Sequence, residues 1–233
     1  MTKGGGATGS LASSTDLEDN YGLNNGSRSG NVYVRGGNDC VKGKCIENDN
    51  DSYVQVSDSS SLDNILDNYT VELWVKLKDI SSNRGVFVKG LASSSSTLGI
   101  HFDASFETCS GGGFQFGKSQ VEDCYGVPKI NEWVHIVYMQ KNSILSIYRN
   151  GALVKNVTNA PSNTSNDYAL TLGRNGTSGE NLNGFLDEIR LYKKALSDAQ
   201  IKQNYIAGLN SLLAKGGISK EEYNQRIESL SQN

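Results

Sequence analysis

Between residues 31 and 192, short runs of alternating apolar and polar residues follow one another, separated by clusters of Gly, Asn, Asp and Ser. Such alternation places successive side chains on opposite faces of a β-strand. Asn150-Gly151 joins two of these runs, and this dipeptide is typical of a β-hairpin turn. Because no helical pattern interrupts the series, the chain is predicted to be all-β, a two-sheet antiparallel sandwich. The candidate strands are residues 31–34, 52–56, 70–77, 85–90, 97–103, 113–117, 132–139, 144–149, 152–156, 168–174 and 184–192.

The last part of the chain, residues 197–233, changes to a helical pattern. Ser197 followed by Gln200 forms a capping box, and Ser219 followed by Glu222 marks the start of a second helix. The predicted apolar stripes are Ile201, Tyr205, Leu209 and Leu212 in the first helix and Tyr223, Ile227 and Leu230 in the second. A helical hairpin of this size is too small to be stable alone, so we expect it to dock on the sandwich or on another chain.

Composition limits the partners and the location. The net charge of −3 gives no reason to expect nucleic acid or an anionic membrane as a partner. No apolar run approaches the length of a membrane span, and the N-terminus lacks the apolar stretch of a secretory signal peptide. Export would therefore need a targeting segment that this chain does not contain. Residues 1–15, rich in Gly and Ser, are predicted to be a flexible leader, followed by the sandwich over residues 16–196.

Four cysteines allow three disulfide connectivities. The short loop CVKGKC favours a Cys40–Cys45 pair, and the segment between the other two favours a hairpin linked by Cys109–Cys124. Zinc binding is an alternative, although these spacings fit the usual C-x2–4-C pairs poorly. Free thiols in a reducing cytosol are a second alternative. Disulfides are the favoured interpretation, and they imply an oxidising, extracellular setting.

Asparagines in the N-x-Ser/Thr motif weakly favour the same setting. A chain this rich in Asn, Ser and Thr contains several such motifs by chance. The possible glycosylation sites are Asn25, Asn50, Asn68, Asn156, Asn163 and Asn175.

Four blocks stand out in order along the chain. They are CVKGKCIENDNDSYVQVSDSSSLDN, YTVELWVKL, NEWVHIVYMQKNSILSIYRNGALV, and LTLGRNG followed by LNGFLDEIRLYKKALSDAQI. In this order they resemble laminin-G-like members of the concanavalin A-like lectin/glucanase superfamily, over roughly residues 16–206. The resemblance implies a jelly-roll sandwich, a fold that carries lectins, adhesive modules and glycosidases alike. Residues 104–126, with their own cysteine pair, depart from the pattern and are expected to be a protruding insert suited to recognition.

The resemblance also implies a structural calcium ion at the rim of the sandwich. In the alternating pattern of residues 185–192, Asp187 shares the apolar face with Phe185, Ile189 and Leu191, where a carboxylate must be paired, hydrogen-bonded or bound to a cation. Calcium takes 6–8 oxygen ligands, so no tight motif is expected. The candidate ligands are Asp187, Asp19, Asn20 and Asp51, with further oxygens from Asp16, Asn24 and Asp49. The alternative is that Asp187 accepts hydrogen bonds from backbone amides while the other acids are solvated.

The sequence contains no evident catalytic array. Retaining glycosidases of this fold place acids on one strand in an E-x-D-x-E-like pattern, about 5 Å apart, whereas LDEIR puts its two acids on opposite faces. His101 and His135 are interpreted as structural, because neither lies near a nucleophile motif. Trp74 and Trp133 are interpreted as packed, which leaves Tyr21, Tyr125, Phe106 and Tyr168 as candidates for a sugar-stacking surface.

The chain is therefore predicted to be an extracellular or cell-surface module for binding or adhesion, not an enzyme, with a glycan as its ligand. The main alternative is a structural subunit of a surface layer or a pilus-like filament. LNSLLAKGGISKEEYNQRIESL resembles short helical hairpins at the ends of some bacterial and archaeal proteins, which implies self-assembly or tethering through the C-terminal hairpin. A glycoside hydrolase is the least favoured interpretation.

Overall fold

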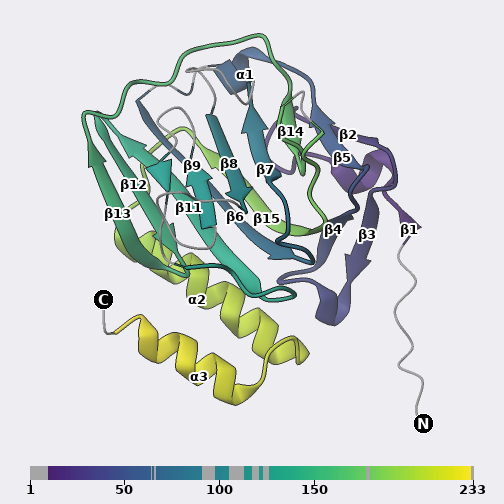
Figure 1. Cartoon of the computed structure of the whole chain (residues 1–233), viewed down its shortest axis with the longest axis vertical. Helices are drawn as coiled ribbons and strands as arrows, with labels where there is room; N and C mark the ends of the chain where they lie inside the picture. The colour runs from purple at the N-terminus through teal and green to yellow at the C-terminus, as the bar shows by residue number, and fades with distance from the viewer. Residues whose placement is uncertain are drawn as a thin grey trace.

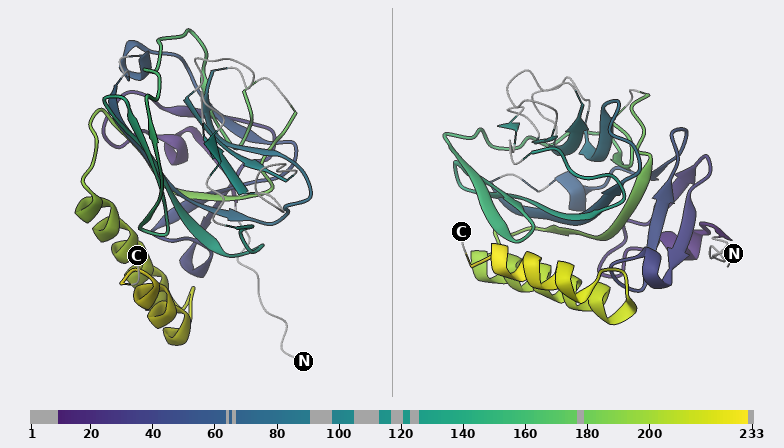
Figure 2. Two further views of the ribbon diagram at one scale, coloured as in Figure 1. Left: turned by 60° about the vertical axis from the view of Figure 1, so that its left-hand side comes forward. Right: turned by 60° about the horizontal axis from the view of Figure 1, so that its bottom comes forward.

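The computed structural model describes residues 10–63, 65, 67–90, 98–104, 113–116, 121–122, 126–176 and 179–231. Two antiparallel sheets lie face to face, and two helices near the C-terminus lie along the outside of one of them (Figure 1; Figure 2). The predicted all-β sandwich with a C-terminal helical hairpin is therefore confirmed.

The larger sheet, sheet A, has the strand order β1-β3-β4-β15-β6-β11-β12-β13. Its strands are β1 (Ser10–Leu11), β3 (Tyr33–Gly36), β4 (Lys44–Asn48), β15 (Gly184–Tyr192), β6 (Asn68–Leu77), β11 (Trp133–Lys141), β12 (Ile144–Arg149) and β13 (Ala152–Thr158). The predicted Asn150-Gly151 turn joins β12 to β13.

The second sheet, sheet B, has the order β10-β9-β8-β7-β14-β5-β2. Its strands are β10 (Val121–Glu122), β9 (Gly113–Phe116), β8 (Leu98–Asp103), β7 (Arg84–Lys89), β14 (Leu170–Leu172), β5 (Tyr53–Val56) and β2 (Gly26–Ser29). The helices are η1 (Ser14–Leu17), η2 (Gly37–Asp39), α1 (Ser60–Asp63), α2 (Asp198–Lys215) and α3 (Lys220–Ser229).

The alternating pattern does not predict β1, β2 or β4. β1 pairs with β3, and Ala12 directly after it is 3% exposed, so the sandwich extends to Ser10, before its predicted start at residue 16. Cys45–Asn48 of β4 are all buried whether polar or apolar, which hides the period-two signal. Such short segments are held by backbone hydrogen bonds to neighbouring strands, and the side-chain pattern of the sequence does not reveal these bonds.

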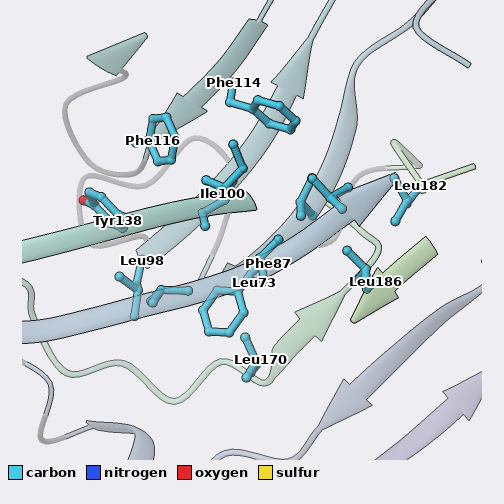
Figure 3. Packing of buried hydrophobic residues seen from close by; sticks show 14 of the residues in the cluster. Leu73, Phe87, Leu98, Ile100, Phe114, Phe116, Tyr138, Leu170, Leu182 and Leu186 are labelled. Carbon is cyan, nitrogen blue, oxygen red and sulfur yellow. The ribbon is translucent and has the colours of Figure 1, made fainter. Parts of the chain in front are cut away.

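Apolar side chains from both sheets fill the space between them (Figure 3). Leu73 of sheet A and Phe87 and Ile100 of sheet B are at most 1% exposed. Burying side chains of this size stabilises the fold by about 1.5–3 kcal/mol each.

The predicted insert at 104–126 contributes to this core. Phe114 and Phe116 of β9 are fully buried, and β9 pairs with β8. The strand predicted at 113–117 is confirmed as β9 of sheet B, so the expectation that the insert protrudes is wrong for this part of it. The predicted Cys109–Cys124 disulfide lies outside the described residues.

A β-bulge in β15 changes which face its residues occupy. Asp187 pairs with Trp74, and the next paired residue is Arg190, so β15 has an extra residue between these two pairs. Glu188, at the bulge, has a φ of 49°. Beyond an extra residue the alternation continues on the opposite face. Leu191 therefore packs against the core between the sheets, and the prediction that it shares a face with Asp187 is wrong.

The helical hairpin docks on the outer face of sheet A, as Figure 2 shows. The predicted stripe of α2 is confirmed: Ile201, Tyr205, Leu209 and Leu212 are fully buried. The Tyr205 ring stacks on Trp74 with 5.4 Å between ring centroids and 18° between planes. Trp74 and Trp133 are buried as predicted, but they lie beneath the hairpin rather than between the two sheets. Docking on the chain's own sandwich is thus the arrangement observed.

A buried lysine joins two loops at the end of the sandwich that carries α1. The Lys89 ammonium, on a side chain 4% exposed, donates to Asp58 Oδ1 at 2.6 Å and to the backbone oxygens of Asn166 and Tyr168 at 2.9 and 2.7 Å. Asp63 lies 3.3 Å from the same ammonium. Two carboxylates and two carbonyls therefore satisfy this cation inside the protein.

We expect Gly208→Ala to destabilise the protein, although alanine favours helix by about 1 kcal/mol. A Cβ on Gly208 would lie 2.3 Å from Trp74 Cζ2, and overpacking of this kind costs about 1–3 kcal/mol. Thermal unfolding and the near-ultraviolet circular dichroism of the tryptophans test this. Ala207→Gly, at an exposed position of the same helix, is the control and should leave the tryptophan signal unchanged. A higher melting temperature for Gly208→Ala would contradict the docking geometry.

Lys89→Met should lower the free energy of unfolding by roughly 2–4 kcal/mol, because it leaves partly buried carboxylates without their cation. Urea denaturation measures the loss. Lys129→Met removes an exposed ammonium, on a side chain 86% exposed and 3.9 Å from Glu132, and should change stability by less than about 0.5 kcal/mol. If the two substitutions lowered the free energy of unfolding equally, the buried ammonium of Lys89 would stabilise the protein no more than an exposed one.

Candidate functional site

A polar depression of about 410 Å³, here called the rim pocket, lies at one rim of the sandwich. It is lined by Ser81, Ser82, Asn83 and Arg84 at the β6–β7 turn, Ala104 after β8, and Gly179 and Glu180 before β15. These segments meet because β7 pairs with β8 and the amide of Gly85 donates to the carbonyl of Glu180 at 2.9 Å. The volume is within the range of small-ligand sites, and the lining offers hydroxyl, amide and charged groups.

Arg84 is the cation of the rim pocket and is 8% exposed. One terminal nitrogen is paired with the Asp79 carboxylate, and the other donates to the backbone oxygen of Asn181 at 3.0 Å. Its Nε has no hydrogen-bond partner among the described residues. The guanidinium is thus held in place by two contacts, while its Nε–H has no acceptor in the described part of the chain.

One acid, Glu180, and one cation, Arg84, line the rim pocket. The Glu180 carboxylate accepts from the side-chain amide of Asn175. His101 lies across the strand pair from Gly85, next to Arg84. Burial lowers the pKa of His101 to about 4, against the opposing effect of the Glu180 and Asp103 charges. The imidazole is therefore neutral near neutral pH and adds no positive charge.

Sequence reasoning did not single out Arg84 or Glu180. Ser81–Arg84 lie in an ordinary turn between two predicted strands, and Glu180 is in a Gly- and Asn-rich loop. The topology of the sheets brings these segments together, and no motif or residue spacing in the sequence predicts that they meet.

Asp187 lies at the outer face of sheet A against the Cys40–Cys45 loop. The predicted Cys40–Cys45 disulfide is present, with both residues buried. The Asp187 carboxylate accepts from the amides of Lys42 at 2.9 Å and Glu188 at 2.7 Å. Burial raises its pKa to about 6, although these amides favour the charged form. Backbone N–H groups present their positive ends to an anion, so this carboxylate fits the alternative of an amide cap better than a calcium ligand.

The candidate calcium ligands are separated into local loops. Asp19 accepts from the amides of Tyr21 and Asn24 at 3.0 and 3.3 Å, whereas Asp51 is exposed and donates its amide to Asp49. Asn20 is exposed. In the part of the chain that the structure describes, one group of three His, Cys, Asp or Glu side chains has ligand atoms within 4.8 Å of one another. It consists of Asp187 and the two disulfide-bonded cysteines, whose sulfurs are unavailable as thiolate ligands. Calcium binding stays a prediction.

A second, shallow depression of about 120 Å³ brings three acids near one another. They are Asp16, Asp187 and Glu188. Each has a partner: the Lys44 ammonium lies 2.8 Å from Asp16, Arg190 pairs with Glu188, and amides bind Asp187. Each of these three carboxylates is therefore engaged by a neighbouring cation or by backbone amides.

His135 forms a fully buried pair with Glu72 beneath α2. His135 Nε2 lies 2.9 Å from Glu72 Oε1, and the amide of Asn204 donates to Glu72 Oε2 at 2.9 Å. Burial acts to raise the pKa of Glu72, but His135, Arg190 and Asn204 outweigh it and the pKa is lowered. This is the structural role predicted for His135, and the pair has no contact with the rim pocket.

Among the predicted stacking aromatics, Tyr21 is 98% exposed and Tyr168 is 42% exposed, and neither lines the rim pocket. Tyr125 and Phe106 lie outside the described residues. Of the possible glycosylation sites, Asn163 and Asn175 use their side-chain nitrogens in internal hydrogen bonds. The exposed ones are Asn25, Asn50, Asn68 and Asn156. Within the described residues, no helix is long and apolar enough to cross a membrane.

Comparison with known proteins agrees with the fold. The laminin-G-like family model described as "Concanavalin A-like lectin/glucanases superfamily" matches residues 48–202. A search of curated protein sequences found no match.

Solved structures resemble the chain at low sequence identity. Domain 4 of AbnA, a GH43 extracellular arabinanase from Geobacillus stearothermophilus solved with arabinotriose, aligns with a TM-score of 0.63 and 21% identity, over 81% of this chain and 92% of that domain. The binding domain of Paraclostridial Mosquitocidal Protein 1 aligns with a TM-score of 0.59 and 14% identity, over 86% and 51%. The binding domain of botulinum neurotoxin serotype G gives 0.52 and 14%, over 78% and 46%. The chain thus spans about half of the last two structures.

The raised pKa of Asp187 makes stability depend on pH in a direction unusual for an acid. Between pH 4 and 6 the folded protein keeps the proton that the unfolded chain has released, so stability falls as pH rises through this window. Relative to Asp187→Asn, we expect the wild type to lose on the order of 2 kcal/mol between pH 4 and pH 7. Urea denaturation of both proteins at the two pH values measures it, and a constant difference would contradict the burial of this carboxylate.

Proposed function

Because the chain belongs to the concanavalin A-like lectin/glucanases superfamily, we propose that it is a non-catalytic carbohydrate-binding module whose sugar lies in the rim pocket. The observation that carries the proposal is the pocket itself, which has a volume of about 410 Å³. Its polar lining consists of two serines, an asparagine and two side chains of opposite charge, Arg84 and Glu180. Sugars present many hydroxyl groups, which both donate and accept hydrogen bonds. A lining of mixed donors and acceptors suits them better than it suits an apolar ligand.

One structural relative was solved with an oligosaccharide. It is a domain of an arabinanase, solved with arabinotriose, and it aligns over 92% of its length. The other two that we compared are named as binding domains. At these identities the likeness concerns the fold, so the ligand class for this chain rests on the rim pocket together with the family.

We place the module outside the cell or at its surface, in adhesion or polysaccharide binding. The buried Cys40–Cys45 disulfide supports an oxidising compartment, and the arabinanase that contains the similar domain is extracellular. Calcium is part of the proposal only through the family resemblance, and the binding measurements are therefore designed with calcium and with a chelator.

A structural subunit remains the second candidate because the chain has a helical hairpin. The stripe formed by Ile201, Tyr205 and Leu209 is already covered by sheet A, so assembly would have to use the outward surface of the hairpin. Sedimentation over a wide concentration range separates the candidates. A concentration-dependent increase in mass supports a subunit, and a constant monomer supports the binding module.

We expect a glycan array to show binding by the wild type and a loss of at least tenfold for Gly179→Leu. A Cβ on Gly179 meets nothing within 4 Å, so the larger side chain can enter the rim pocket without disturbing the fold. Gly36→Leu is the matched control, because its Cβ would also be unhindered, with its nearest neighbour at 3.8 Å, and Gly36 does not line the pocket. Melting temperatures confirm that both variants fold.

Two outcomes would contradict this proposal. Binding that Gly179→Leu leaves intact would move the site away from the rim pocket. No binding to any glycan, with calcium or with a chelator, would leave the structural subunit as the better candidate.

A further inference from the structure

The loop closed by the Cys40–Cys45 disulfide lies beside the turn that joins α2 to α3 (Figure 2). Cys40, Cys45 and the intervening Val41 are at most 4% exposed. They share one apolar cluster with Leu212 of α2 and with Ile218, which precedes α3. The disulfide loop is therefore part of the surface on which the helical hairpin docks.

Hydrogen bonds from both sides hold the backbone of this loop. The carbonyl of Cys40 accepts from the Lys215 ammonium, in the last turn of α2, at 2.7 Å. The amide of Lys42 donates to the Asp187 carboxylate of β15 at 2.9 Å. The loop thus connects the end of α2 to sheet A, and the position of Cys40 decides where α2 finds its acceptor.

The disulfide ties Cys40 to the sheet. Cys45 belongs to β4 and pairs with Arg35 of β3, so the strand ladder sets its position. Cys40 follows η2, and its amide donates to the Gly37 carbonyl at 3.4 Å, which is long for a hydrogen bond. A disulfide restricts the conformations that the chain between its two cysteines can adopt. Opening it would leave Cys40 without its covalent connection to β4.

Both tryptophans of the chain lie beneath the hairpin, so their environment reports on its docking. Trp74 stacks with Tyr205 of α2. The indole N–H of Trp133 donates to the carbonyl of Asp39, at the entry to the disulfide loop, at 3.2 Å. The Trp133 carbonyl accepts from Arg226 of α3 at 2.9 Å. Trp133 therefore contacts the loop and the hairpin together, and a movement of the loop reaches the surface that holds α3.

We propose that the Cys40–Cys45 disulfide is a redox-controlled latch that keeps the helical hairpin docked on sheet A. A dithiol reductant opens it: one thiolate attacks a sulfur, and the second releases the mixed disulfide. The protein gains two thiols, and the dithiol becomes a disulfide after giving up two electrons and two protons. The loop then loses its fixed position, and the hairpin separates and uncovers Trp74 and Trp133. In the location proposed above, the hairpin docks once the chain reaches an oxidising compartment.

Hydrogen exchange of backbone amides in the oxidised protein and in the protein reduced with dithiothreitol tests the latch. We expect exchange in α2 and α3 to become at least tenfold faster on reduction, with a red shift of tryptophan fluorescence, while β7 and β8 of sheet B change by less than about twofold. Replacing both Cys40 and Cys45 by alanine should reproduce these changes without reductant. Adding reductant to that double variant should have no further effect, which is the control for Cys109 and Cys124.

Docking should also protect the disulfide, because coupling between two equilibria is reciprocal. Leu212→Ser places a hydroxyl at a fully buried position of α2 and weakens docking while both cysteines stay in place. We expect dithiothreitol to reduce Cys40–Cys45 at least tenfold faster in this variant than in the wild type. Ala214→Ser, at an exposed position of the same helix, is the matched control and should leave the rate unchanged. Thiol trapping followed by mass spectrometry measures the rate at these two cysteines.

Three results would overturn the inference, and none of them bears on sugar binding in the rim pocket. The first is unchanged exchange in α2 and α3 after reduction. The second is an equal loss of protection in sheet B, which would make the disulfide a support of the whole fold. The third is an equal rate of reduction in Leu212→Ser and the wild type. If Leu212→Ser is unfolded, Lys215→Met takes its place, because it removes the hydrogen bond to Cys40.

Discussion

From Tyr69 to Val75, β6 is covered on both faces, by sheet B on one side and by the helical hairpin on the other, so the polar groups in this part of the strand must be satisfied inside the protein. Thr70, Glu72 and Trp74 are at most 2% exposed. Thr70 donates to the backbone of Lys194 at 2.9 Å, and Glu72 binds His135 and Asn204 of α2. The hairpin therefore does more than cover an apolar surface, because it supplies a partner to a carboxylate that has no access to water.

Burial on both faces of a strand limits how much of the fold can be predicted from the sequence alone. Alternation predicts most strands well, and the capping residues Ser197 and Ser219 predict where the two helices begin, since both signals are local. The pattern fails at β4, where Cys45–Asn48 are buried on both faces. It also fails at Glu188, because a single extra residue reverses the faces that follow and the sequence contains no signal for the bulge.

The candidate site was far less predictable than the fold. The sequence identifies Asp187 as an acid in an apolar setting, but in the structure it accepts from the amide of Lys42 in the Cys40–Cys45 loop and from that of Glu188, which no local pattern reveals. Arg84 and Glu180 are brought together only by the pairing of β7 with β8 and by the loop that precedes β15. Such sites depend on contacts between distant segments, whereas strands and helix starts depend on neighbours in the chain.

The rim pocket is formed by turns, including the one that follows β6, and not by the buried part of that strand, which has a consequence for how this protein tolerates change. Substitutions on β6 disturb packing on whichever face they occupy, so that strand is expected to vary little among related proteins. At the rim, Gly179 has open space around it and Ser81 and Ser82 are exposed. A new ligand preference can therefore arise by replacing a few turn residues, without any cost to the layers that hold the molecule together.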